Sequence, residues 1–132
     1  LCKGYTFKEV HQMITSVSSE IPSDINFTDV LKSMFPMGSM TGAPKLRAME
    51  MIEHFEGFKR GIFSGAVGYI TPSADFDFNV VIRTILYNLA SGYLSIGVGG
   101  AITIKSQPID EYYECLIKVK PIFDILHFEI DD

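Results

Sequence analysis

Three apolar runs, rich in β-branched and aromatic residues, limit what this chain of 132 residues can fold into. They cover residues 62–71, 76–89 and 93–104, and their composition is typical of β-strands. Only the short segments 72–75 and 90–92, which contain turn-forming residues, separate them. Because short connections join antiparallel neighbours, the pattern predicts an antiparallel meander of three strands.

Apolar residues recur at helical spacing on both sides of these runs. We predict helices over residues 7–19, from a cap at Thr28 to about residue 35, from Pro44 to about residue 55, and over 109–120 with an extension towards 126. Pro121 is expected to kink or restart the last helix. This order predicts an α+β fold, an antiparallel sheet with flanking helices. These helices would leave parts of the sheet uncovered, so we expect the chain to be part of a larger fold.

Composition excludes several classes of protein. The net charge is −5 and no block of Lys or Arg occurs, which argues against binding to nucleic acid or an anionic membrane. No apolar stretch reaches the roughly 18–20 residues that cross a bilayer. Cys2 and Cys115 are isolated thiols, so a reduced, cytoplasmic protein is expected. The amino terminus lacks Met and a leader pattern, which suggests an internal start.

A small-residue segment from Gly38 to Lys45 leads into the third predicted helix. Gly38 and Gly42 allow the backbone to approach a ligand closely, and the free N–H groups of the following helix could bind a carboxylate or phosphate. The segment lacks the Gly-Lys-Ser/Thr order of a P-loop. The alternative is a glycine turn with a Ser or Thr cap, which local chemistry alone favours.

Glu111, Glu114 and Lys118 share one face of the last predicted helix, because they are three and seven residues apart. Two carboxylates one turn apart make an oxygen site suited to Mg²⁺ with retained waters. The alternative is a solvated face with a Glu114–Lys118 ion pair, the commoner outcome for this spacing.

Arg83 stands alone in an apolar run, and Gly97-Val98-Gly99-Gly100 removes side chains from another. A guanidinium in such a run faces solvent, a carboxylate or a ligand. The glycines indicate close approach by another group, or a β-bulge. Taken singly, an outward-facing arginine is at least as common as one that binds a ligand, and a bulge is at least as common as close approach by another group.

Taken together, these segments resemble, in order, the hallmark motifs of chorismate-utilising enzymes. The matches are Phe35-Pro36-x-Gly38-Ser39-x-Thr41-Gly42-Ala43-Pro44-Lys45-x-Arg47-Ala48-Met49-Glu50, Gly65-x-x-Gly68-Tyr69, Ile82-Arg83-Thr84, Gly99-Gly100 and Glu111-Tyr112-x-Glu114-x-x-x-Lys118. The ordered set covers about residues 10–126. Its first motif is more similar to component I of para-aminobenzoate synthase, also called aminodeoxychorismate synthase, than to component I of anthranilate synthase.

The resemblance implies a fold and an activity. Residues 1–132 would be the C-terminal portion of a chorismate-binding domain, a partial copy of the anthranilate-synthase-component-I-like fold. The family reaction, of the transferase and lyase type, aminates chorismate at C4 to 4-amino-4-deoxychorismate for para-aminobenzoate and folate synthesis. Ammonia, normally supplied by a glutamine amidotransferase subunit, would be the nitrogen donor.

The resemblance also implies roles for single residues. Chorismate would be held by four side chains and a stretch of backbone: Thr41, Tyr69, Arg83, Lys118 and the main chain of Gly99, Gly100 and Ala101. Arg83 and Lys118 would face its carboxylates, as a guanidinium fork suits such a group. Glu114 would be a Mg²⁺ ligand, with Glu111 as a second or water-mediated one.

Three departures from the family pattern limit these roles. Ala101 stands where relatives often have a third glycine, and Gln12 stands where many have a histidine, whose proton-donor role an amide cannot take over. The upstream segments with the nucleophilic lysine and a further acidic ligand find no match, so no catalytic residue is assigned and the fragment is expected to be inactive alone.

Missing upstream segments also predict exposed apolar surface on the sheet, with self-association through it. Alternatives within the family are anthranilate synthase component I and isochorismate synthase. An alternative from another class is a non-catalytic interaction module.

Overall fold

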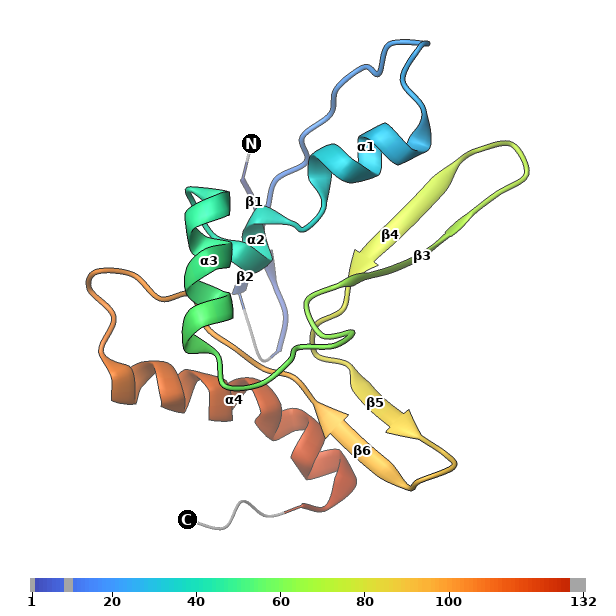
Figure 1. Cartoon of the computed structure of the whole chain (residues 1–132). Coiled ribbons are helices and arrows are strands. Elements are labelled where there is room, and N and C mark those ends of the chain that lie inside the picture. The colour runs from blue at the N-terminus through green and yellow to red at the C-terminus, as the bar shows by residue number, and fades with distance from the viewer. Residues whose placement is uncertain (1, 9–10, 129–132) are drawn as a thin grey trace. The chain divides into compact units, whose positions relative to one another are not determined.

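The computed structural model describes residues 2–8 and 11–128, and the chain divides into two units, Leu1–Phe35 and Pro36–Asp132 (Figure 1). Each unit combines α-helix with antiparallel strands. The predicted α+β class with antiparallel pairing is therefore confirmed.

The first unit is a hairpin followed by a helix. β1 (Lys3–Thr6) pairs antiparallel with β2 (His11–Ile14), and α1 covers Phe27–Met34. The side chain of Asn26, two residues before the predicted cap Thr28, accepts a hydrogen bond from the backbone N–H of Asp29 at 3.1 Å. A side-chain oxygen in this position stabilises the first helical turn. The α1 helix was thus predicted correctly, but its cap was not.

The helix predicted over residues 7–19 is wrong. Its place is taken by β2 and an irregular segment, with the part at Val10 outside the described residues. Residues 11–14 pair with residues 3–6 as a hairpin, a partner that the spacing within the segment does not reveal. Met13 and Val17 are 78% and 92% exposed, so the predicted apolar face is not a packed one. Instead, the hydroxyl oxygen of Thr15 accepts a hydrogen bond from the N–H of Cys2 at 3.1 Å and closes the hairpin.

The helices of the second unit are α2 (Gly38–Thr41), α3 (Lys45–Phe55) and α4 (Pro108–Leu126). The two longer ones confirm the predicted helices, and α4 continues through Pro121 without a restart. The α2 turn replaces part of an expected loop, and Pro44 immediately precedes α3. Nowhere in the described chain does a helix have the length and apolarity needed to span a membrane.

The strands of the second unit form two separate hairpins. β3 (Ala66–Ile70) pairs antiparallel with β4 (Phe76–Val80), and β5 (Ile85–Asn88) pairs with β6 (Tyr93–Ile96). The predicted turns at 72–75 and 90–92 are confirmed. At the second turn, the side chain of Asn88 accepts hydrogen bonds from the N–H groups of Ala90 and Ser91 at 3.0 and 3.2 Å, as turn asparagines often do.

The predicted three-stranded meander is wrong because its central strand breaks. The N–H of Ile82 donates to the carbonyl of Val80 at 3.0 Å, and Arg83 has a left-handed φ of 51°. The Thr84 hydroxyl donates to the carbonyl of Ile82 at 2.8 Å. A left-handed residue interrupts a strand ladder, so the chain turns and starts a new hairpin. The third run also ends early, at Ile96.

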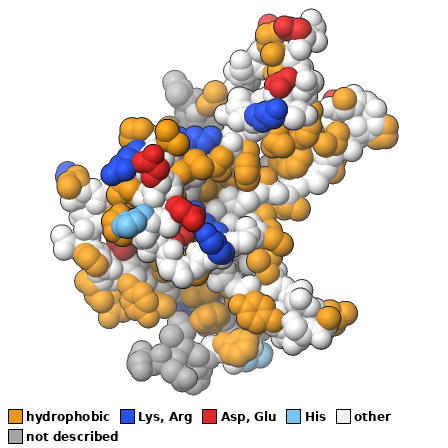
Figure 2. Space-filling model, in the orientation of Figure 1, with side chains coloured by type: hydrophobic (Ala, Val, Ile, Leu, Met, Phe, Trp, Pro, Cys, Tyr) orange, Lys and Arg blue, Asp and Glu red, His pale blue; other side chains and the backbone are white. Residues whose placement is uncertain are grey.

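Very little of the described chain is buried. Its accessible surface is 11549 Å², against about 7,000 to 8,000 Å² for compact proteins of this mass, taken as one body or as two. Only Val81 and Val119 are buried apolar residues among those described. Hydrophobic side chains are instead spread over the visible surface (Figure 2). The expected exposure of apolar surface is therefore observed, including on both hairpins of the second unit.

Candidate functional site

The carboxylates of α4 and a glycine loop meet in the second unit. The amino group of Lys118 lies 2.5 Å from Oε1 of Glu114 and donates a hydrogen bond to the carbonyl of Gly99 at 2.9 Å. A Cβ placed on Gly100 would lie 2.8 Å from Oε2 of Glu111 and 3.8 Å from Oε1 of Glu114. Five of the predicted site residues are therefore close together.

The Glu114–Lys118 ion pair is the alternative expected for a solvated helix face, and it forms. It does not exclude a binding site, because Lys118 also holds the loop backbone at Gly99. Lys118 is half-buried, at 31% exposure, whereas Glu114 is exposed, at 52%. One ammonium thus faces both a carboxylate and the carbonyl of the glycine loop, an arrangement that fixes all three groups.

Glu111 has an oxygen without a partner. Its Oε2 atom is buried and forms no hydrogen bond with any of the described residues. A buried carboxylate oxygen that is left unpaired costs free energy, which a cation or a hydrogen-bond donor would recover. The orphan atom lies beside Gly100, on the side where Glu114 also approaches. Among the described residues it is the one buried side-chain oxygen or nitrogen that has no hydrogen bond.

The donor set fits Mg²⁺ better than it fits a soft metal. Two carboxylates supply hard oxygen ligands, and Mg²⁺ normally keeps several waters or substrate oxygens in addition. No group of three or more His, Cys, Asp or Glu residues that could hold a metal occurs within residues 2–8 and 11–128. Glu111 and Glu114 offer two carboxylates here, and any further ligand of a cation would have to be water or substrate.

The glycine run 97–100 has more than one role. Gly97 packs under the ring of Phe63, because an added Cβ would lie 2.3 Å from the ring carbon Cγ. Gly99 supplies the carbonyl for Lys118, and Gly100 leaves room for the Glu111 carboxylate. Close approach, one of the two predicted alternatives, thus explains two of these glycines. The adjacent Ala101 is exposed and follows in the same irregular segment.

The remaining predicted residues are not joined to this cluster by any hydrogen bond or ion pair among the described residues. Arg83 is exposed at the bend between the hairpins, and Tyr69 is exposed on β3 opposite Asp77. Thr41 is half-buried, and its hydroxyl donates to the carbonyl of Met37 at 3.1 Å. In the first unit, Gln12 lies on β2 opposite Tyr5.

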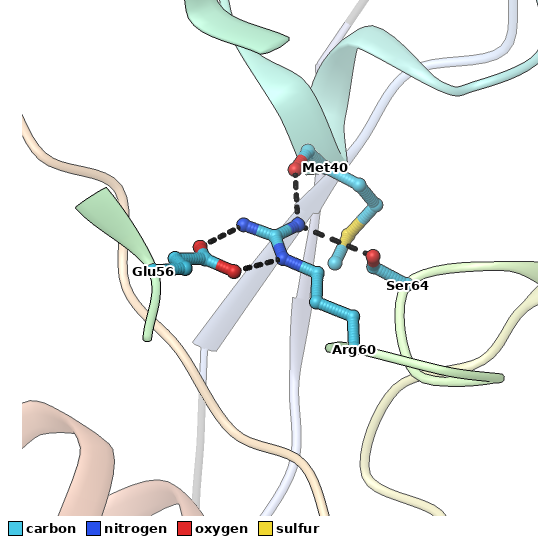
Figure 3. A network of polar contacts seen from close by, with 4 residues as sticks. All are labelled: Met40, Glu56, Arg60 and Ser64. Atoms are coloured by element: carbon cyan, nitrogen blue, oxygen red, sulfur yellow. Dashed lines mark hydrogen bonds and ion pairs between the residues drawn. The ribbon is translucent and has the colours of Figure 1, made fainter. Parts of the chain in front are cut away.

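The sequence patterns did not single out a network around Arg60. Its guanidinium forms two hydrogen bonds with the carboxylate of Glu56, one of them at 2.7 Å, and donates to the carbonyl of Met40 and the hydroxyl of Ser64 (Figure 3). The hydrogen bond with Glu56 raises the pKa of Arg60 above its usual value, against the effect of desolvation. The spacing of four residues could have indicated the Glu56 contact, but not the other two.

Known proteins share sequence similarity with most of this chain. A family described as chorismate binding enzyme matches residues 1–124. An aminodeoxychorismate synthase of Streptomyces griseus is 40% identical over 92% of this chain and 16% of its own length. A probable chloroplastic aminodeoxychorismate synthase of Oryza sativa subsp. japonica is 46% identical over 87% of this chain and 13% of its own. Anthranilate synthase component 1 of Acinetobacter calcoaceticus is 38% identical over 88% and 23%.

These relatives are several times longer than the matched region, since the chain spans between 13% and 23% of their lengths. The family match, in contrast, covers nearly all of the chain. This chain belongs to the family of chorismate binding enzymes.

Proposed function

We propose that this chain forms one wall of the chorismate pocket of an aminodeoxychorismate synthase component I. Residues 1–132 would be the C-terminal portion of a domain with the anthranilate-synthase-component-I-like fold. The whole protein would convert chorismate and ammonia to 4-amino-4-deoxychorismate and water. The names of relatives at 40% and 46% identity support this choice of reaction.

The observation that carries the proposal is the unpartnered Oε2 of Glu111 beside Gly100 and Glu114. These two carboxylates would hold Mg²⁺, which would neutralise a carboxylate of the substrate and orient it. Lys118 fixes Glu114 and the Gly99 carbonyl in their present positions. It would thereby orient a ligand oxygen before the substrate enters.

Arg83 would supply the second positive group. It is exposed and forms no hydrogen bond or ion pair with another described residue, so its guanidinium fork is free to bind a carboxylate. Thr41, Tyr69 and the backbone from Gly99 to Ala101 would complete the contacts with chorismate. The nucleophilic lysine of the family would come from chain outside these residues, so we expect the 132 residues alone to be inactive.

The proposed setting follows from the same assignment. A glutamine amidotransferase subunit, or free ammonia, would supply nitrogen for para-aminobenzoate and folate synthesis. Cys2 and Cys115 are free thiols, which supports a cytoplasmic location. The exposed apolar side chains would be covered by the rest of the domain, or by another copy when these residues are alone.

The test uses the complete protein that contains these residues, with ammonia as nitrogen donor. We expect Arg83→Ala and Glu114→Gln each to lower chorismate turnover by about 10-fold to 100-fold, as for other ligand and supporting residues. Glu114→Gln should also raise the Mg²⁺ concentration needed for half-maximal rate. Glu53→Gln, on the exposed side of α3, is the matched control.

Product analysis separates the alternatives. Formation of 4-amino-4-deoxychorismate supports the proposal, whereas anthranilate or isochorismate would assign the chain to another branch of the family. Near-normal rates in both site variants would contradict the site. Absence of both chorismate binding and turnover in the complete protein would favour a non-catalytic interaction module.

A further inference from the structure

Arg60 ties three segments of the second unit together. Its Nε donates to Glu56 at 2.7 Å, and its Nη1 donates to the Met40 carbonyl at 3.0 Å and to the Ser64 hydroxyl at 3.2 Å. A second bond joins Nη2 to the other Glu56 oxygen. Figure 3 shows the guanidinium between these groups, with Met40 and Ser64 on one side and Glu56 on the other. Glu56 caps α3, Met40 lies in α2, and Ser64 precedes β3.

Two of these segments lead to predicted substrate contacts. Thr41 directly follows Met40, and the next residue, Gly42, has a φ of 131° that side chains rarely adopt. Its place is tight, because an added Cβ would lie 3.1 Å from the Cβ of Ala48. The segment around Thr41 therefore has a specific backbone conformation. The Met40 carbonyl that accepts from Arg60 directly precedes Thr41.

The other segment leads to Tyr69. The N–H of Ser64 donates to the carbonyl of Val81 at 3.0 Å, and the N–H of Val81 donates to the carbonyl of Gly65 at 2.9 Å. These bonds extend the β3–β4 ladder to the residue that Arg60 holds. Arg60 therefore connects the base of the strand that carries Tyr69 with the α2 turn that carries Thr41.

Only an arginine can make this set of contacts. A guanidinium presents a planar fork to a carboxylate and still has N–H groups for other acceptors, whereas a lysine is a single point charge. The side chains of Arg60 and Glu56 are 23% and 28% exposed. The adjacent Lys59 and its partner Glu53 are 85% and 76% exposed and reach no other segment. This neighbouring pair offers a natural control.

We propose that Arg60 is a positioning residue that sets the α2 turn against the base of β3, so that Thr41 and Tyr69 are placed for the substrate. Its action is indirect, through the Met40 carbonyl and the Ser64 hydroxyl. The substrate part of this inference rests on the proposed function, whereas the positioning part does not.

The first experiment measures amide hydrogen exchange in the complete protein. The reporters are the N–H groups of Met40, Thr41 and Gly42, which are bonded within the turn. Arg60→Lys should speed their exchange by about tenfold or more, because local opening becomes easier. Lys59→Gln should leave it unchanged. Unchanged exchange in Arg60→Lys, with a normal fold by circular dichroism, would overturn the proposal.

A charge-swapped variant distinguishes the ion pair from the wider network. In Glu56→Arg combined with Arg60→Glu, the two charges still attract each other, but a glutamate at 60 cannot donate to the Met40 carbonyl. Exchange in the turn should remain as fast as in Arg60→Lys. Recovery of the original protection would show that the pair alone matters and would overturn the role of the Met40 contact.

Kinetics test the link to the substrate. Arg60→Lys should raise KM for chorismate by about tenfold with less effect on kcat, as expected when ground-state binding is loosened. Unchanged KM together with faster exchange would overturn the substrate role. If the unmodified complete protein neither binds nor converts chorismate, the proposed function fails, while faster exchange in Arg60→Lys still supports the positioning role.

Discussion

The Oε2 atom of Glu111 would lie only 2.8 Å from a methyl group placed on Gly100, so this glycine leaves the space that the carboxylate occupies. The atom that would have to move is the end of a flexible side chain, and the fold could therefore accept the methyl group. The Glu111 carboxylate would have to leave its present position beside Gly100, however. Gly100 thus tests the proposed metal site without removing either acidic residue.

We expect Gly100→Ala in the complete protein to raise the Mg²⁺ concentration for half-maximal activity by about tenfold, because the Glu111 ligand is displaced. The melting temperature should change little. Gly57→Ala is the control, since an added Cβ there meets nothing within 4 Å. An unchanged Mg²⁺ dependence in Gly100→Ala would contradict the assignment of Glu111.

Lys118 should matter more than its neighbour Lys120. Both lysines form ion pairs across four residues of α4, but only Lys118 also holds the Gly99 carbonyl. We expect Lys118→Gln to lower kcat/KM for chorismate by about 10-fold to 100-fold, because misplaced binding groups slow turnover strongly. Lys120→Gln should have nearly normal kinetics. Equal effects of the two substitutions would show that only helix pairing is involved.

Gly97 should be needed for stability rather than for binding. An added Cβ would overlap the Phe63 ring, at 2.3 Å from Cγ and 2.5 Å from Cδ2. Gly97→Ala should lower the free energy of unfolding by about 1–3 kcal/mol, the usual cost of overpacking. Denaturant unfolding would measure it. The double variant Gly97→Ala with Phe63→Leu should recover part of this loss, and strict additivity would argue against the contact.

The exposed pair of Glu53 and Lys59 predicts a small dependence on pH. Hydrogen bonding and the charge of Lys59 lower the pKa of Glu53 below its ordinary value of 4.5. The lowered pKa means that the stabilising effect is present above 4.5 and is lost as pH falls through the folded-state pKa. Lys59→Gln should move the pKa of Glu53 back up, as measured by carboxyl NMR titration. A pKa that stays low would contradict the pairing.

The isolated 132 residues should self-associate through exposed apolar surface. Their exposed apolar side chains lie on both hairpins of the second unit and on α4, for example Tyr69, Tyr87 and Ile117. We expect the isolated chain to bind a hydrophobic dye and to self-associate in analytical ultracentrifugation, because large exposed apolar patches favour association with other molecules. A monomer without dye binding would show that the apolar side chains find enough cover within the chain.

Residue spacing and turn-forming residues predicted the elements that depend on interactions between sequence neighbours. The α3 and α4 helices and both hairpin turns follow from spacing and turn residues, and helical periodicity correctly placed Glu111, Glu114 and Lys118 on one face. The segment 7–19 has similar apolar spacing, but residues 11–14 pair with residues 3–6 as a β-hairpin. The spacing of apolar residues within a segment does not show whether another strand is available to pair with it, so the same pattern predicted a helix wrongly here.

Contacts between distant residues could not be predicted in this way. Phe63 on Gly97 and Arg60 on Met40 join positions 34 and 20 residues apart, and no periodicity links such pairs. The break at Arg83 depends on a left-handed backbone that β-branched neighbours do not suggest. The resemblance to a family identified Arg83 by its motif. The bend of the backbone at Arg83 could be seen only in the structure.

Each sheet in the described chain has two strands, so every strand keeps one side whose peptide groups have no neighbouring strand. Two-stranded ribbons are marginal in water, and open strand edges recruit other chains. A gene rearrangement that moved these residues to another protein would thus carry open edges with it rather than a finished module. Such a transfer would be tolerated more easily if it also brought strands that pair with these edges.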